Sequence, residues 1–202
     1  MTKTTFVGLI MALVAGPALA LQGQVVESGT GRPLPGVFVF VWWMGDMSIA
    51  VQPATRCYKA DILTTDSEGR FQVPEMSGNI NPLITDRRRN LRFYKPGYRE
   101  MVRAAASDRV VMGKRDPQKR AQSFVEVFEE TLPSYCDFAD KKLLSVLKAM
   151  DPEVTALAET QREKERSLGT KYAIERIELG EEAARRNLDE RFAALRAKGR
   201  SQ

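Results

Sequence analysis

The hydrophobic pattern divides the chain into a strand-like first half and a helix-like second half. Its strongest signal is the uninterrupted apolar run of residues 37–43, which is rich in β-branched and aromatic side chains. A half-buried strand would alternate with polar residues, so this run predicts a strand that is covered on both faces. Because a two-layer sandwich covers only one of these faces, we expect helices to cover Phe38, Phe40 and Trp42 on the other.

The remaining β signals are shorter and are separated by turn residues. We expect strands at residues 22–27, 57–65, 70–73, 91–95 and 109–112. Within residues 65–71 we predict a hairpin turn in which Gly69 adopts a positive φ. Residues 44–56 are predicted to form a loop and residues 77–90 an irregular insertion, because both contain glycine and proline together with aspartate or asparagine.

Apolar residues take a helical spacing in the second half of the chain. One stripe ends before Pro133, a second spans residues 143–150, and residues 151–153 (Asp-Pro-Glu) predict the start of another helix. Toward the C-terminus apolar residues become sparse among Glu, Lys and Arg. This last segment is predicted to be a long solvated helix, a weak coiled coil or a partly disordered tail, with Gly169 and Gly180 as candidate interruptions.

Histidine is absent from the 202 residues, and this absence excludes several classes of chemistry. It removes Ser-His-Asp and Cys-His catalysis, histidine-ligated zinc and imidazole acid–base chemistry. The hydrophobic content of 43% and the charged content of 28% are typical of a globular protein. We therefore expect a folded protein without catalytic residues, a metal site or a cofactor.

Residues 1–20 have the organisation of a secretory signal peptide. Lys3 precedes an apolar region at residues 6–15, and Ala18, Leu19 and Ala20 form an A-x-A cleavage site. We expect cleavage after Ala20 and a bacterial periplasmic or secreted location. The apolar region at residues 6–15 is too short for a membrane span. We expect no membrane span after the signal peptide has been cleaved.

The net charge of +5 is distributed unevenly. Residues 21–115 carry 14 Lys and Arg against 9 Asp and Glu, whereas residues 116–202 carry 16 against 17. A surplus of this size is more typical of a solvated surface than of a nucleic-acid interface. We therefore expect no nucleic acid as a partner.

Export favours a disulfide between the two cysteines, Cys57 and Cys136. An oxidising compartment allows this bond, which would hold a strand against the helical region. The alternatives are two buried free thiols, or a bond from Cys136 to another chain. Two cysteines without histidine do not complete a structural zinc site.

Two groups of side chains are candidate binding residues. They are Arg87, Arg88, Arg89, Arg92, Trp42 and Trp43. The arginines offer planar forks that suit phosphate, acidic glycans or a negatively charged partner, and the alternative is a solvated loop held by nearby acidic residues. The tryptophans, with Tyr94, offer a platform for sugar rings, and the alternative that we favour is burial in the core.

Four segments, in order, resemble the carboxypeptidase regulatory-like domain. They are residues 23–27 (GQVVE), 31–37 (GRPLPGV), 65–71 (TDSEGRF) and 96–98 (PGY). The resemblance covers residues 21–112 and implies a prealbumin-like, or transthyretin-like, antiparallel β-sandwich. The expected fold class is therefore α+β, with this sandwich at residues 21–115 and a helical extension at residues 116–202.

The resemblance also guides the expected function. Modules of this family accompany zinc peptidases, outer-membrane receptors and adhesion proteins, mostly as non-catalytic attachments. We therefore expect an exported interaction or accessory protein of the cell envelope that is not an enzyme and binds another envelope protein through its helical extension. The alternative is a module that binds carbohydrate, such as an envelope glycan, or another anionic ligand. A hydrolase with a carboxylate or lysine base ranks last, because no motif supports it.

Overall fold

The chain folds into strands followed by helices. In the computed structural model, which describes residues 21–49, 52–75, 84–103, 109–133 and 136–199, there are seven strands and four helices. The strands are β1 (Leu21–Glu27), β2 (Phe38–Ile49), β3 (Gln52–Thr64), β4 (Arg70–Val73), β5 (Ile84–Tyr94), β6 (Tyr98–Arg103) and β7 (Arg109–Lys114). The helices are α1 (Arg120–Phe128), α2 (Asp140–Leu157), α3 (Gln161–Leu179) and α4 (Glu181–Gly199). The predicted α+β class, with sheets first and helices after, is confirmed.

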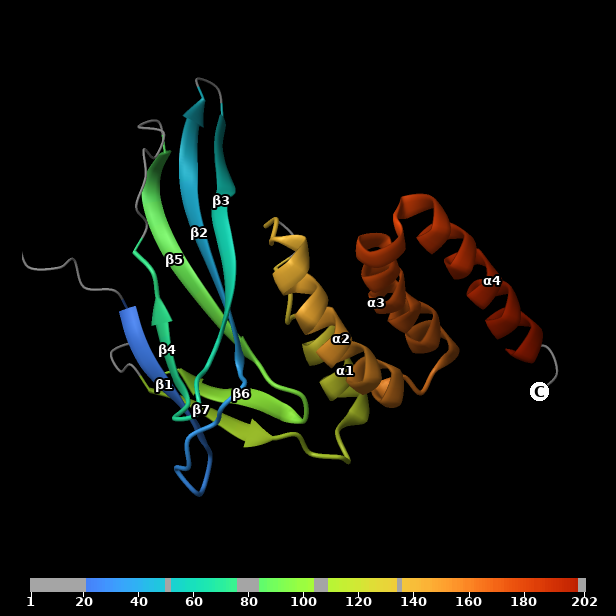
Figure 1. Cartoon of the computed structure of the whole chain (residues 1–202), viewed down its shortest axis with the longest axis horizontal. Coiled ribbons are helices and arrows are strands. Elements are labelled where there is room, and N and C mark those ends of the chain that lie inside the picture. The colour runs from blue at the N-terminus through green and yellow to red at the C-terminus, as the bar shows by residue number, and fades with distance from the viewer. Residues whose placement is uncertain (1–20, 50–51, 76–83, 104–108, 134–135, 200–202) are drawn as a thin grey trace, which may run out of the picture.

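The strands form two sheets that pack on each other (Figure 1). One sheet has the order β4-β1-β7-β6 and the other has the order β3-β2-β5. The paired strands are antiparallel except for β1 and β7, which run parallel. This pair corrects the expectation of a purely antiparallel sandwich. Because β1 and β7 are the first and last strands, the strands between them supply the long crossover that a parallel pair requires.

Strand β2 belongs to two hydrophobic cores. Its Val39, Val41 and Trp43 pack with residues of β1, β4 and β7 in the other sheet. Its Phe40 and Trp42 point the opposite way and pack with residues of α1 and α2. These five side chains are at most 5% exposed. The prediction of a strand covered by a sheet on one face and by helices on the other is confirmed.

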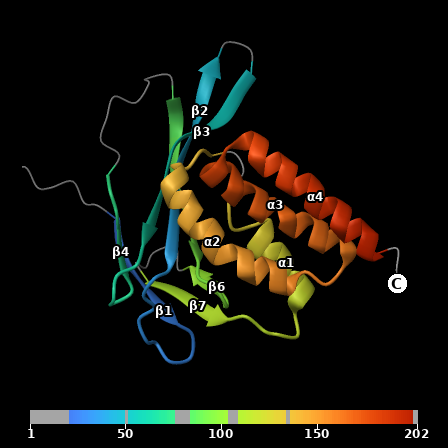
Figure 2. The same cartoon turned by 45° about the vertical axis from the view of Figure 1, so that its right-hand side comes forward.

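Strands β2 and β3 continue beyond the cores as a long hairpin, which rises above the helices in Figure 2. The prediction of a loop at residues 44–56 is therefore wrong. Gly45 marks a close approach between strands and not a turn, because a Cβ at this position would lie 2.3 Å from Cγ2 of Ile84 on β5. The glycine that indicated a loop in fact lets β5 continue alongside β2.

Strand β5 replaces the second half of the predicted irregular insertion at residues 77–90, and the first half, residues 77–83, lies outside the described residues. Its first half pairs with the distal part of β2, as in the pair of Arg88 and Met44. Sequence reasoning did not predict β6, which lies at the edge of its sheet and pairs with β7. Both strands depend on partners that local propensity cannot identify.

Helix α2 continues through Asp151 and Pro152, where a new helix was predicted to start. The buried residues of this helix are Val146, Leu147, Met150 and Val154. They form one stripe that extends past Pro152, so burial of the stripe outweighs the backbone hydrogen bond that proline cannot donate. Helix α1 ends at Phe128, before the predicted stop at Pro133.

The C-terminal segment is a helical hairpin and neither a single helix nor a tail. Helix α3 begins with a capping box between Thr160 and Glu163. It ends at Gly180, whose φ of +89° is accessible to glycine without strain. Gly169 lies inside α3 and does not interrupt it. Helix α3 packs on α2, and α4 packs on α3 as the outermost layer (Figure 1).

The predicted disulfide between Cys57 and Cys136 is present. The sulfur atoms are 2.07 Å apart, and the bond connects β3 to the segment between α1 and α2. Both cysteines border the core that β2 shares with the helices, so the bond closes that core at one edge. None of the described helices is long and apolar enough to cross a membrane. The predicted signal peptide at residues 1–20 lies outside the described residues.

Candidate functional site

The four arginines predicted as an anion-binding cluster lie along β5 but do not share a face. They are Arg87, Arg88, Arg89 and Arg92. Arg89 is paired with Trp43 and Arg88 with Met44, so these two arginines point to opposite sides of the sheet. Arg88 also lies 3.4 Å from the carboxylate of Asp46. The structure therefore does not bring the four candidate arginines together on one face.

Trp42 and Trp43 are core residues. They point to opposite faces of β2 and are 5% and 4% exposed. Tyr94, the third member of the predicted aromatic platform, is 1% exposed. The Nζ of Lys59 lies 5.2 Å from the ring centroid of Trp43. Since a sugar ring stacks on an exposed aromatic face, this burial excludes the platform and agrees with the favoured core interpretation.

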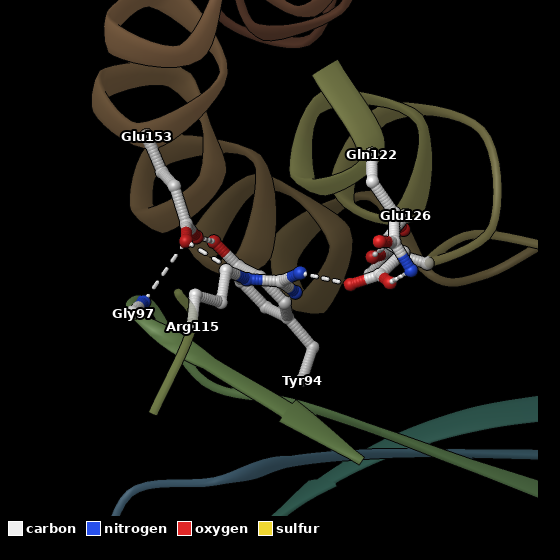
Figure 3. Close-up of polar contacts among 7 residues, drawn as sticks. Tyr94, Gly97, Arg115, Gln122, Glu126 and Glu153 are labelled. Carbon is white, nitrogen blue, oxygen red and sulfur yellow. Dashed lines mark hydrogen bonds and ion pairs between the residues drawn. The ribbon is translucent and has the colours of Figure 1, made fainter. Parts of the chain in front are cut away.

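Arg115 connects the sheets to α1 and α2 (Figure 3). It follows β7 directly, and its Nη1 donates a hydrogen bond to Glu126 of α1 at 2.6 Å. Its Nε lies 3.2 Å from Oε1 of Glu153 on α2, which is an ion-pair distance without the alignment of a hydrogen bond. The side chain of Arg115 is only 10% exposed, so water screens both ion pairs weakly.

Glu153 is the second centre of this network. Its Oε2 accepts a hydrogen bond from the hydroxyl of Tyr94 at 2.7 Å, and its Oε1 accepts one from the backbone N–H of Gly97 at 2.9 Å (Figure 3). Burial, reinforced by the negative charge of Glu153, raises the pKa of Tyr94 far above its ordinary value. Tyr94 therefore remains a hydrogen-bond donor at all physiological pH values.

Glu126 completes the network on α1. Its Oε1 accepts a hydrogen bond from Gln122 at 3.0 Å, while its Oε2 pairs with Arg115. Both carboxylates of the network therefore have donors for each oxygen, and Arg115 neutralises much of their charge. Because these donors and acceptors are paired, the network fixes the positions of α1 and α2 relative to the sheets.

A pocket of about 300 Å³ lies beside this network, between β5, β6 and the end of α1. It is lined by Arg92, Phe93, Arg99, Glu100, Arg115, Glu126, Glu130 and Thr131. Three arginines and three glutamates surround a space large enough for a small molecule. The pocket can therefore hold a charged ligand through ion pairs and hydrogen bonds.

Sequence reasoning did not identify Arg115 or Glu153 as site residues. Residues 113–118 were interpreted as a boundary, and Glu153 as part of a helix start. One signal was present: Glu153 directly precedes Val154, a member of the apolar stripe. A carboxylate beside a buried stripe requires a donor from the element that covers it.

Among the described residues, no three or more Cys, Asp or Glu side chains are grouped so that they could hold a metal ion. Comparisons with family models, with curated proteins and with solved structures find no match to this chain. Its function is therefore inferred from its own residues.

Proposed function

We propose that the chain is an exported, non-catalytic accessory protein of the bacterial cell envelope that binds another envelope protein through α3 and α4. The observation that carries this proposal is the layering of the helices (Figure 1). The Cys57–Cys136 bond and the Arg115 network attach α1 and α2 to the sheets. Helices α3 and α4 lie outside this base, with α4 packed on α3. A fixed base that carries an outer helical hairpin is suited to presenting a surface to a protein.

The turn between α3 and α4 offers an apolar contact point. Leu179 is 60% exposed at the end of α3. Charged residues of both signs surround it in sequence, and Glu182 and Arg186 are exposed on α4. An apolar anchor within a charged rim is typical of surfaces that bind proteins.

We further propose that residues 21–115 are a prealbumin-like sandwich of the carboxypeptidase regulatory-like family. Thr65 supports this assignment, because its hydroxyl joins two of the segments that carry the resemblance. Its Oγ1 accepts a hydrogen bond from the N–H of Val37 at 2.9 Å and donates one to the carbonyl of Leu34 at 2.8 Å. Both bonds are buried, so threonine at this position stabilises the loop between β1 and β2.

Two other residues of the 65–71 segment support the same assignment. The carboxylate of Asp66 accepts hydrogen bonds from the backbone N–H groups of Glu68 and Arg70 at 2.9 and 2.8 Å. Gly69 has a φ of +69°, and a Cβ there would lie 2.5 Å from the carbonyl oxygen of Val25. The segment therefore requires these residue types for its turn.

The export part of the proposal is tested by the mass of the protein isolated from its native cells. We expect to find the protein in the envelope fraction, with a chain that begins at Leu21 and with its two cysteines oxidised. A cytoplasmic chain that retains residues 1–20 contradicts export, whatever its partner.

Site-specific photocrosslinking in the native cells tests the partner. A crosslinking amino acid at Leu179 is compared with one at Gln72, which is exposed on β4. We expect a single protein adduct from Leu179, identified by mass spectrometry, that is absent from Gln72 and is reduced by Arg186→Glu. No adduct from Leu179, or the same adducts from both positions, contradicts binding through the hairpin.

A further inference from the structure

We propose that the pocket between β5, β6 and the end of α1 binds a small zwitterion, an amino acid or short peptide that carries a carboxylate and an ammonium group. This ligand site is independent of the protein partner proposed for α3 and α4. It is defined by Arg92, Arg99 and Glu130, which line the pocket and have no role in the Arg115 network.

Arg92 and Arg99 are the cationic side of the site. Both are partly buried, and they reach the pocket from different strands, β5 and β6. Neither guanidinium group has an ion pair or hydrogen bond with another side chain or backbone group in the described parts of the chain. Two like charges that share a partly buried pocket repel each other, and a carboxylate between them removes this cost. The planar fork of arginine also matches the two oxygens of a carboxylate.

Glu130 is the anionic side of the site. It follows α1, lines the same pocket and is exposed, and within the described residues its carboxylate has no ion-pair partner. The other members of the lining are committed differently: Arg115 and Glu126 pair with each other, and Thr131 donates its hydroxyl proton to the backbone carbonyl of Glu126. Glu100 also has an interaction of its own, so the groups left for a ligand are two cations and one anion.

This balance favours a zwitterion over a polyanion. A phosphate dianion would gain from Arg92 and Arg99 but would be repelled by the glutamates that line the same space. A carboxylate carries less charge, and an ammonium group on the same ligand can pair with Glu130. The volume of about 300 Å³ accommodates an amino acid or a dipeptide.

Titration of the oxidised mature protein, residues 21–202, tests the site with four probes. The probes are alanylalanine, acetate, ethylammonium and inorganic phosphate, and binding is followed by amide chemical shifts in NMR. We expect alanylalanine to bind most tightly and to shift the amides of Arg92, Arg99 and Thr131. Phosphate that binds as tightly as alanylalanine, shifts confined to other regions, or no saturable binding of the dipeptide each overturns the proposal.

Variants assign the two ends of the ligand. Arg92→Gln and Arg99→Gln should each weaken alanylalanine binding about tenfold, the effect of losing one charge-assisted hydrogen bond. Glu130→Gln should weaken alanylalanine binding but leave acetate binding unchanged, and because Glu130 is exposed this variant keeps its fold. Arg89→Gln is the matched control, since it removes the same charge from the opposite face of β5. Equal effects of Arg89→Gln and Arg92→Gln would show a general charge effect and overturn the assignment.

Discussion

Glu153 accepts the hydroxyl hydrogen bond of Tyr94 at 2.7 Å across 59 positions of sequence. The bond joins the last residue of β5 to the C-terminal part of α2, and Arg115 approaches the other oxygen of the same carboxylate. The helices are thus attached to the sheets by directional polar contacts as well as by apolar packing. Polar contacts of this kind specify one orientation, whereas apolar packing alone tolerates several.

Replacement of Arg115 should destabilise the protein strongly. Arg115→Met leaves Glu126 and Glu153 without their shared cation in a partly buried setting, and we expect a loss of about 2–4 kcal/mol in the free energy of unfolding. Urea denaturation measures this loss. Arg89→Met, an exposed change on β5, should alter stability by less than about 0.5 kcal/mol. Similar losses of stability in the two variants would contradict the proposal that Arg115 stabilises the attachment of α1 and α2 to the sheets.

Removal of the disulfide should loosen the helices more than the sheets. The bond spans 79 positions of sequence, and chain-entropy estimates for such a loop give about 4 kcal/mol of stabilisation. We expect a comparable loss in the double variant Cys57→Ala and Cys136→Ala. Hydrogen exchange should accelerate in α1 and α2 and change little in β1 and β7. Uniform acceleration in all elements would argue against a local attachment of the helices.

The two faces of β2 should respond differently to truncation. Phe40→Ala opens the core shared with the helices and should cost about 3–5 kcal/mol, whereas Val39→Ala opens the core between the sheets and should cost about 2 kcal/mol. Hydrogen exchange should increase first in α1 and α2 for Phe40→Ala, and in β1 and β7 for Val39→Ala. The same exchange pattern for both variants would contradict two separate cores.

Asp151 should make stability depend on pH. It lies on α2 with one oxygen buried and without a hydrogen bond, and burial raises the pKa of its carboxyl although Lys171 and Arg191 oppose the shift. The folded state therefore holds this proton more tightly than the unfolded chain. The resulting stabilisation is complete at low pH and is lost as pH rises through the raised pKa.

The variant Asp151→Asn removes this titration. We expect it to be more stable than the native chain at pH 7, with a difference that shrinks toward pH 3, as measured by urea denaturation at both values. Asp189→Asn, an exposed change on α4, is the control and should show no such trend. A native chain that is more stable than Asp151→Asn at pH 7 would show that Lys171 and Arg191 outweigh burial.

The parts of the fold that were predicted correctly are those encoded locally. The apolar run at residues 37–43 required a cover on each face. Because the chain was expected to be exported, its two cysteines indicated the disulfide that holds the helical cover in place. Gly45 and Pro152 misled the prediction because each indicates a break when read with its neighbours alone. In the structure a strand partner accommodates Gly45 and a buried stripe carries α2 past Pro152.

The site residues were harder to predict for the same reason. Arg115 and Glu153 meet only after β7 and α2 are packed, and neither belongs to a motif. The arginines of β5 were grouped because they are consecutive, but adjacent residues of a strand point to opposite faces. Arg92 and Arg99 share a pocket because the turn at Gly97 brings β5 and β6 together.

Because residues 39–43 of β2 serve two cores, this part of the strand has no face that tolerates substitution freely. In β4, exposed Arg70 and Gln72 alternate with buried Phe71 and Val73, so every second position can accept substitutions. Along residues 39–43 each side chain is buried, and a polar replacement meets either the partner sheet or the helices. A scan of all single substitutions should therefore show its longest run of intolerant positions here. Residues 39–43 contact both the partner sheet and the helices, so a change that disturbs one core is transmitted through this segment to the other.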